Sequence, residues 1–164
     1  MNIDWKTFIA ECYATRKASE PDVVPQFYPG ADEACLAAAE ADLGFPLPTE
    51  LRELLSQSDG VKEQLLLDDG PIEISWLVWS TEELIASNLS LRGEAGVSAA
   101  HRLTQGIFFV NAGMGGSQLG LDGRPSDRPS CPVFVWHPIE DRTEVLAHSL
   151  ADFLTRWIQG GITL

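Results

Sequence analysis

The sequence predicts an α+β fold in which N-terminal helices and a C-terminal helix pack on a mostly antiparallel sheet. Apolar residues recur at helical spacing before residue 60 and again after residue 149. Between these regions, short runs of alternating apolar residues are separated by turn-forming residues and by one further helical segment at 80–91. The length of 164 residues suits one domain, assigned to residues 1–164, and the hydrophobic fraction of 45% supports a buried core.

The first 30 residues predict one helix followed by an irregular connector. Residues 4–17 place apolar side chains at i, i+3, i+4, i+7 and i+8, on one helix face: Trp5, Phe8, Ile9, Cys12 and Tyr13. Residues 20–30 contain three prolines, which block a regular helix. We therefore expect a connector that Phe27 and Tyr28 fix to the core.

Two more helices are expected before residue 60. Asp32 is a good N-cap for a helix over residues 32–43, and Gly44 suits the left-handed position past its end. Pro46 and Pro48 then force an extended link. A third helix begins near residue 48, buries its leucines and ends before Gly60.

The remaining chain predicts strands and two helices. Residues 64–67 and 72–76 flank a turn at 68–71 and form a hairpin. Ser80 and Glu83 form a capping box for a helix over 80–91, and 93–105 is expected to be a loop. Strands are expected at 106–110, 118–121, 132–136 and 144–147, with a polar loop at 122–130 and a final helix at 150–159. Trp76 and Trp79 would face opposite sides of a regular strand, because they are an odd number of positions apart. One of them is therefore expected to be exposed or covered by a helix.

Charge narrows the class of partner. The chain has 24 acidic and 11 basic residues, a net charge of −13. Such a field repels nucleic-acid phosphates and anionic lipids and attracts basic proteins, although acidity also keeps a protein soluble. We expect a basic protein partner, with no nucleic acid and no membrane. The N-terminus lacks a signal-peptide pattern and no apolar run is long enough to span a bilayer, so we expect a cytoplasmic location.

No motif predicts catalysis, a metal site or a cofactor. The three cysteines and three histidines show no zinc or metalloprotease spacing, and no Gly-x-Ser-x-Gly elbow occurs. The glycine-rich run at 113–117 could cradle a phosphate, but a hairpin with a bulge requires the same glycines. We predict that the protein is not an enzyme and has no cofactor or metal. Catalytic groups brought together only by folding are the alternative.

Several segments, in order, resemble one family. Residues 43–55 read Leu-Gly-Phe-Pro-Leu-Pro-Thr-Glu-Leu-Arg-Glu-Leu-Leu and are closed by Asp59-Gly60. The Phe108-Phe109-Val110 strand, the Val133-to-His137 strand and the Ser149-Leu150-Ala151-Asp152-Phe153-Leu154 helix start follow. This set resembles the SUKH superfamily of the Smi/Knr type over residues 30–160. One departure is at 113–117, where the family often has Gly-Asp.

The resemblance implies a function in protein binding. Many bacterial SUKH proteins are immunity proteins that neutralise polymorphic toxins, often nucleases. Fungal relatives are cell-wall and signalling regulators, which leaves a regulatory scaffold as the alternative. Fold-level analogy does not choose between these uses.

We expect the partner to contact acidic turns at the sheet edge, with an exposed aromatic residue nearby as an anchor. Carboxylates in turns face solvent and can pair with lysine or arginine, whereas apolar stripes are buried in the core. The competing surface is the first helix with the connector at 21–29. The predicted partner-binding residues are Asp68, Asp69, Asp122, Asp127, Glu140 and Asp141.

Overall fold

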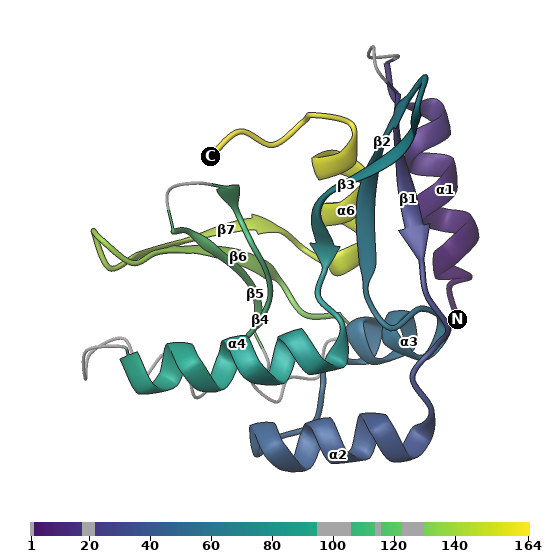
Figure 1. Cartoon of the computed structure of the whole chain (residues 1–164). Helices are drawn as coiled ribbons and strands as arrows, with labels where there is room; N and C mark the ends of the chain where they lie inside the picture. The colour runs from purple at the N-terminus through teal and green to yellow at the C-terminus, as the bar shows by residue number, and fades with distance from the viewer. Residues whose placement is uncertain (1, 18–21, 95–105, 114–115, 123–129) are drawn as a thin grey trace.

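The computed structural model describes residues 2–17, 22–94, 106–113, 116–122 and 130–164 (Figure 1). Its described helices are α1 (Trp5–Thr15), α2 (Glu33–Leu43), α3 (Thr49–Gln57), α4 (Thr81–Glu94) and α6 (Leu150–Ile158). Its described strands are β1 (Val23–Phe27), β2 (Val61–Leu67), β3 (Gly70–Val78), β4 (Gly106–Asn111), β5 (Gln118–Asp122), β6 (Val133–His137) and β7 (Arg142–Ala147).

The strands divide between two sheets. One has the order β1-β2-β3 and the other β4-β5-β6-β7, and every neighbouring pair is antiparallel. Buried residues from both sheets and from α1, α2, α3, α4 and α6 form one hydrophobic cluster. In Figure 1, α1 lies along β1, and α2 and α4 lie together at one end of the molecule. The α+β class and the antiparallel pairing predicted from the sequence are confirmed.

The two sheets are joined at the end of β3. The backbone N–H of Trp79 donates to the Phe109 oxygen at 2.8 Å. Beside it, the amide of Asn88, only 2% exposed, bonds to both backbone groups of Phe108. Its Nδ2 donates to the Phe108 oxygen at 2.8 Å, and its Oδ1 accepts from the Phe108 N–H at 2.9 Å. One side chain of α4 therefore takes the place of a neighbouring strand at this point of β4.

The turn between α2 and α3 gives a physical reason for the glycine and prolines at 43–48. Gly44 ends α2 with a φ of 87°, a left-handed conformation that suits glycine. The Glu40 carboxylate accepts from the Leu47 N–H at 2.8 Å and from the Arg52 Nε at 3.0 Å. Arg52 also pairs with Glu33 at 2.6 Å, so one guanidinium holds α3 to both ends of α2.

Most predicted elements are present with shifted ends, and one strand was missed. Asp4, Asp32 and Ser149 cap α1, α2 and α6 through their side chains. The connector at 20–30 contains strand β1, whose Pro25 pairs opposite Glu63. Proline is tolerated there because β1 is an edge strand. The expected loop at 93–105 lies almost wholly outside the described residues.

Replacing Asn88 with alanine is expected to lower the free energy of unfolding by about 2–3 kcal/mol, because both backbone groups of buried Phe108 lose their partners. Urea denaturation at neutral pH measures the change. The control is Asn111→Ala, at the exposed end of β4, where the change is expected to stay within about 0.5 kcal/mol. Equal losses in the two variants would contradict the bridging role of Asn88.

Candidate partner-binding surface

The predicted carboxylates at the two hairpin turns differ in their surroundings. Asp68 and Asp69 form the β2–β3 turn, and both are exposed. At the β6–β7 turn, Glu140 lies 3.8 Å from Arg142. Asp141 accepts from the Trp136 indole N–H at 3.2 Å and has a φ of 46°. Asp68 and Asp69 therefore remain available to a partner, whereas the other pair already has contacts within its own hairpin.

Asp122 lies far along the sheet from Glu140 and Asp141. It ends β5, pairs opposite Gly106 and donates its N–H to the Pro132 oxygen at 3.2 Å. The β6–β7 turn lies at the other end, where β5 begins with Gln118 opposite Trp136. Asp127 lies outside the described residues. The described carboxylates thus occupy three separate places, since antiparallel strands send alternate turns to opposite ends.

One face of the three-stranded sheet has no described helix over it (Figure 1). The register pairs Lys62 with Trp76 and Gln64 with Glu73 on this side. Side chains that point the other way, such as Glu63, lie towards α1, and burial raises the pKa of the Glu63 carboxyl. We call the uncovered side the open face and define it by Gln26, Tyr28, Lys62, Gln64, Glu73 and Trp76.

Two aromatic side chains and the lysine side chain that packs against one of them lie at the centre of the open face. The rings of Tyr28 and Trp76 are 6.0 Å apart, and Lys62 Nζ lies 4.6 Å from the Trp76 ring centre. Lys62 also pairs with Glu73 at 3.0 Å. Trp76 is half-buried and Trp79 is 5% exposed, so Trp76 is the tryptophan left accessible.

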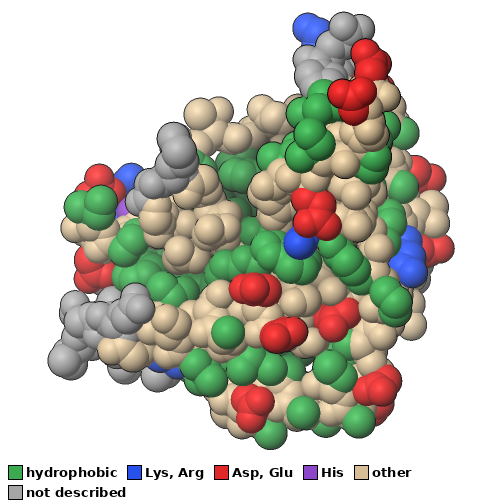
Figure 2. Space-filling model, viewed as in Figure 1, with side chains coloured by type: hydrophobic (Ala, Val, Ile, Leu, Met, Phe, Trp, Pro, Cys, Tyr) green, Lys and Arg blue, Asp and Glu red, His purple; other side chains and the backbone are tan. Residues whose placement is uncertain are grey.

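The acidic rim of the open face includes the start of α4. Hydrogen bonding to Glu73 is the main cause of the raised pKa of Lys62, and the Glu83 carboxylate raises it further. Glu82 and Glu83 are both exposed. Figure 2 shows acidic side chains around apolar ones on this side of the molecule. The open face therefore has an apolar, aromatic centre and a rim that is mostly acidic.

Gly60 fixes the position of Trp76. Its φ is 90°, and a Cβ there would lie 2.7 Å from both the Trp76 ring and the Ser80 nitrogen. Only glycine accommodates this conformation and this contact together. Ser58 and Asp59 complete the turn: Ser58 Oγ accepts from the Tyr28 N–H at 3.0 Å, and Asp59 accepts from the Thr81 N–H at 2.7 Å. This one turn thus positions both aromatic rings and the start of α4.

Exposed aliphatic side chains surround the Asp68–Asp69 turn. Ile72 and Ile74 are 53% and 51% exposed, and Leu66 and Leu67 are exposed as well. Ile74 is the extra residue of a β-bulge opposite Glu63 and Gln64. Such a group of large apolar side chains at a projecting hairpin is typical of a surface that another molecule covers.

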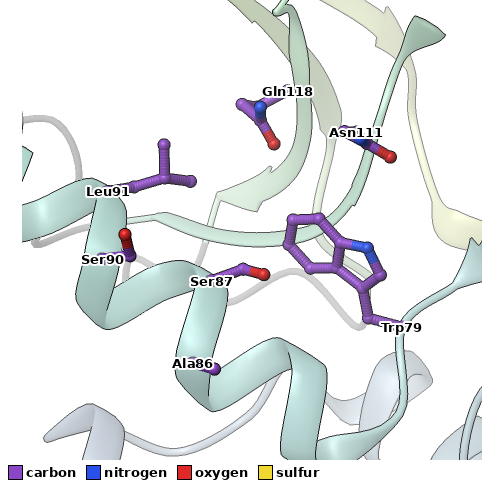
Figure 3. A pocket seen from close by; sticks show the side chains of 7 residues that line it. All are labelled: Trp79, Ala86, Ser87, Ser90, Leu91, Asn111 and Gln118. Carbon is purple, nitrogen blue, oxygen red and sulfur yellow. The ribbon is translucent and has the colours of Figure 1, made fainter.

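A hollow of about 340 Å³ lies between α4 and the β4–β5 connection (Figure 3). Among the residues that the structure describes, its lining carries no charged side chain and includes Trp79, Ala86, Ser87, Ser90, Leu91, Asn111 and Gln118. Gln118 Nε2 donates to the Gly116 oxygen at 3.2 Å, while its Oε1 is buried with no hydrogen-bond donor. An unpaired buried acceptor costs about 1–3 kcal/mol. The hollow therefore offers polar groups that the chain itself does not fully satisfy.

The glycine-rich connection between β4 and β5 holds a serine–histidine contact. Ser117 Oγ lies 2.8 Å from His137 Nδ1. A nucleophilic serine requires a base that a third group orients, and no hydrogen bond from His137 to a carboxylate is found in the described part of the chain. Within the same residues, no group of three or more histidine, cysteine or acidic side chains is placed to hold a metal. No described helix is long and apolar enough to cross a membrane.

Replacing Gly60 with alanine is expected to destabilise the fold more than replacing Gly44. Both residues have a left-handed backbone conformation, which costs alanine about 1–2 kcal/mol. At Gly44 an added Cβ would meet open space. The contacts with Trp76 and Ser80 add about 1–3 kcal/mol in Gly60→Ala. Urea denaturation measures both, and equal losses would contradict a close contact between Gly60 and Trp76.

Comparison with known proteins places the chain in a family. The model of the SMI1 / KNR4 family (SUKH-1) matches residues 30–156, which is more than half of the chain. No curated protein gives a significant match. The matched region includes β2, β3 and the described lining residues of the hollow, whereas α1 and β1 precede it. The resemblance found in the sequence is therefore confirmed, and the chain belongs to the SMI1 / KNR4 family (SUKH-1).

Proposed function

We propose that this protein is an immunity protein that binds a basic toxin domain, such as a nuclease, and neutralises it by occluding its functional surface. The observation that carries the proposal is the open face, an uncovered sheet surface with Tyr28 and Trp76 at its centre. Tryptophan and tyrosine are enriched among residues that dominate binding energy at protein interfaces. Family membership supports a binding function of this kind.

Charge supports a basic partner. The chain carries a net charge of −13, and exposed carboxylates at Asp68, Asp69, Glu82 and Glu83 lie beside the open face. A nuclease binds an anionic substrate in a cationic groove, and the same groove attracts an acidic protein surface. Exposed ion pairs at the rim contribute about 1 kcal/mol or less each, so the aromatic centre supplies most of the affinity and the rim guides association.

Among the predicted acidic residues, Asp68 and Asp69 fit this contact best. They lie at the tip of the hairpin that carries the open face, next to exposed Leu67. Asp122, Glu140 and Asp141 lie at the two ends of the other sheet, and their neighbours there already contact them. We therefore centre the proposed contact on the open face and its hairpin.

Co-expression tests the function directly. A toxin domain encoded next to this gene is expected to stop the growth of a host cell, and this protein is expected to restore growth. Trp76→Ala should lose the rescue because it removes the central anchor, whereas Ile139→Ala, at an 89% exposed position on the β6–β7 turn, should retain it. Absence of rescue by the unaltered protein, although both proteins are expressed, would reject the proposed function.

Charge reversal tests the contact. Asp68→Lys with Asp69→Lys is expected to slow association with the toxin domain by about tenfold at low ionic strength and to weaken its salt dependence. The control is Glu11→Lys with Asp42→Lys, which changes the net charge equally at exposed sites on α1 and α2. Stopped-flow fluorescence measures the rates. Equal slowing by both pairs would mean that overall charge, not the hairpin tip, steers the encounter.

A further inference from the structure

We propose that the hollow between α4 and the β4–β5 connection receives the guanidinium group of an arginine side chain from the partner. This inference rests on the proposed function in one respect, the basic character of the partner. The binding chemistry of the hollow itself depends only on residues of this chain, which come from the end of β3, from α4 and from the two ends of the β4–β5 connection.

The lining matches a group that donates hydrogen bonds in several directions. Ser87 and Gln118 present a hydroxyl and an amide to one space, which Asn111 also lines (Figure 3). The Gln118 Oε1 has no donor. The terminal torsion of a glutamine is broad, so a small rotation presents this oxygen to an incoming N–H group. A guanidinium has five N–H donors and no acceptor. It can therefore donate to the Gln118 oxygen, which lacks a donor.

The apolar part of the lining suits the shape of the same group. The indole of Trp79 forms one wall of the hollow, and Ala86 and Leu91 form part of another (Figure 3). A planar guanidinium packs against an aromatic ring, and the aliphatic stem of arginine packs against apolar side chains. The volume of about 340 Å³ lies at the lower end of the range for small-ligand pockets, so one side chain is an appropriate occupant.

Charge selects a cation over an anion or a neutral ligand. None of the described lining side chains is cationic, so among them nothing repels a guanidinium. Glu83 lies one helical turn before Ser87 on α4, and the whole chain has a net charge of −13. An anion meets repulsion from both sources, and an uncharged ligand gains nothing from them. A partner seated on the open face is close to the start of α4, because the Glu83 charge acts on Lys62.

Nuclear magnetic resonance titration of the full ¹⁵N-labelled chain tests the proposal. The probe is N-acetyl-L-arginine amide, and its uncharged isostere N-acetyl-L-citrulline amide is the matched control. The arginine probe is expected to shift the Gln118 side-chain amide and the Trp79 indole signals to saturation, with a Kd in the millimolar range. The citrulline probe is expected to bind at least about tenfold more weakly, since it lacks the charge.

Two substitutions at Gln118 are expected to change the affinity for the arginine probe in opposite directions. Gln118→Glu is expected to tighten arginine binding by about threefold because it adds a negative charge, and Gln118→Leu to weaken it by about fivefold because it removes the acceptor. The same two changes at Gln159, exposed at the end of α6, are expected to leave binding unchanged. If Gln118→Leu does not fold, Ser87→Phe on α4 fills the hollow instead and is expected to abolish the shifts.

Three results would overturn the proposal: equal binding of the two probes, shifts confined to carboxylates outside the hollow, or no effect of Gln118→Glu and Ser87→Phe. The outcomes also separate this inference from the proposed function. Arginine binding without rescue from the toxin rejects the immunity function and leaves the arginine site in place. Rescue without arginine binding in the hollow rejects the site and leaves the immunity function in place.

Discussion

The junction of α4 with the four-stranded sheet depends on one buried amide. Asn88 satisfies both backbone groups of Phe108 from the side of α4, and Trp79 makes the adjacent backbone bond to Phe109. A helix side chain bonds to β4 there in place of a strand, and β3 and β4 belong to two separate sheets (Figure 1). The hollow lies beside this junction, with Trp79 in its lining. The polar contact in the core thus lies next to the hollow and fixes the side of β4 that faces α4.

The residues that give the family its recognisable pattern mainly set geometry. Gly44 and Glu40 form the turn that joins α2 to α3, and Gly60 holds the Trp76 ring beside the start of α4. None of these side chains needs to touch a partner. The pattern therefore defines a scaffold, and the chemistry that selects a partner lies in the strands and turns that this scaffold positions.

Local signals in the sequence predicted the helices well and the arrangement of the strands less well. Caps such as Asp32 and Ser149 act within one turn of chain, so they are visible in sequence. Strand β1 was missed because Pro25 argues against a strand unless the strand is known to lie at an edge. The scatter of the acidic turns and the lining of the hollow depend on strand order and register. Residues such as Trp79 and Gln118 come together only through that tertiary pairing.

The bulge at Ile74 has a consequence for how copies of this protein behave towards one another. A long edge strand with apolar side chains is a template for joining sheets from separate molecules. In β3 the bulge interrupts the regular spacing of backbone donors and acceptors, and Pro71 removes one donor. A flat second strand therefore cannot add along the full edge. The hairpin can expose its isoleucines without driving aggregation, and it remains accessible to a partner with a complementary shape.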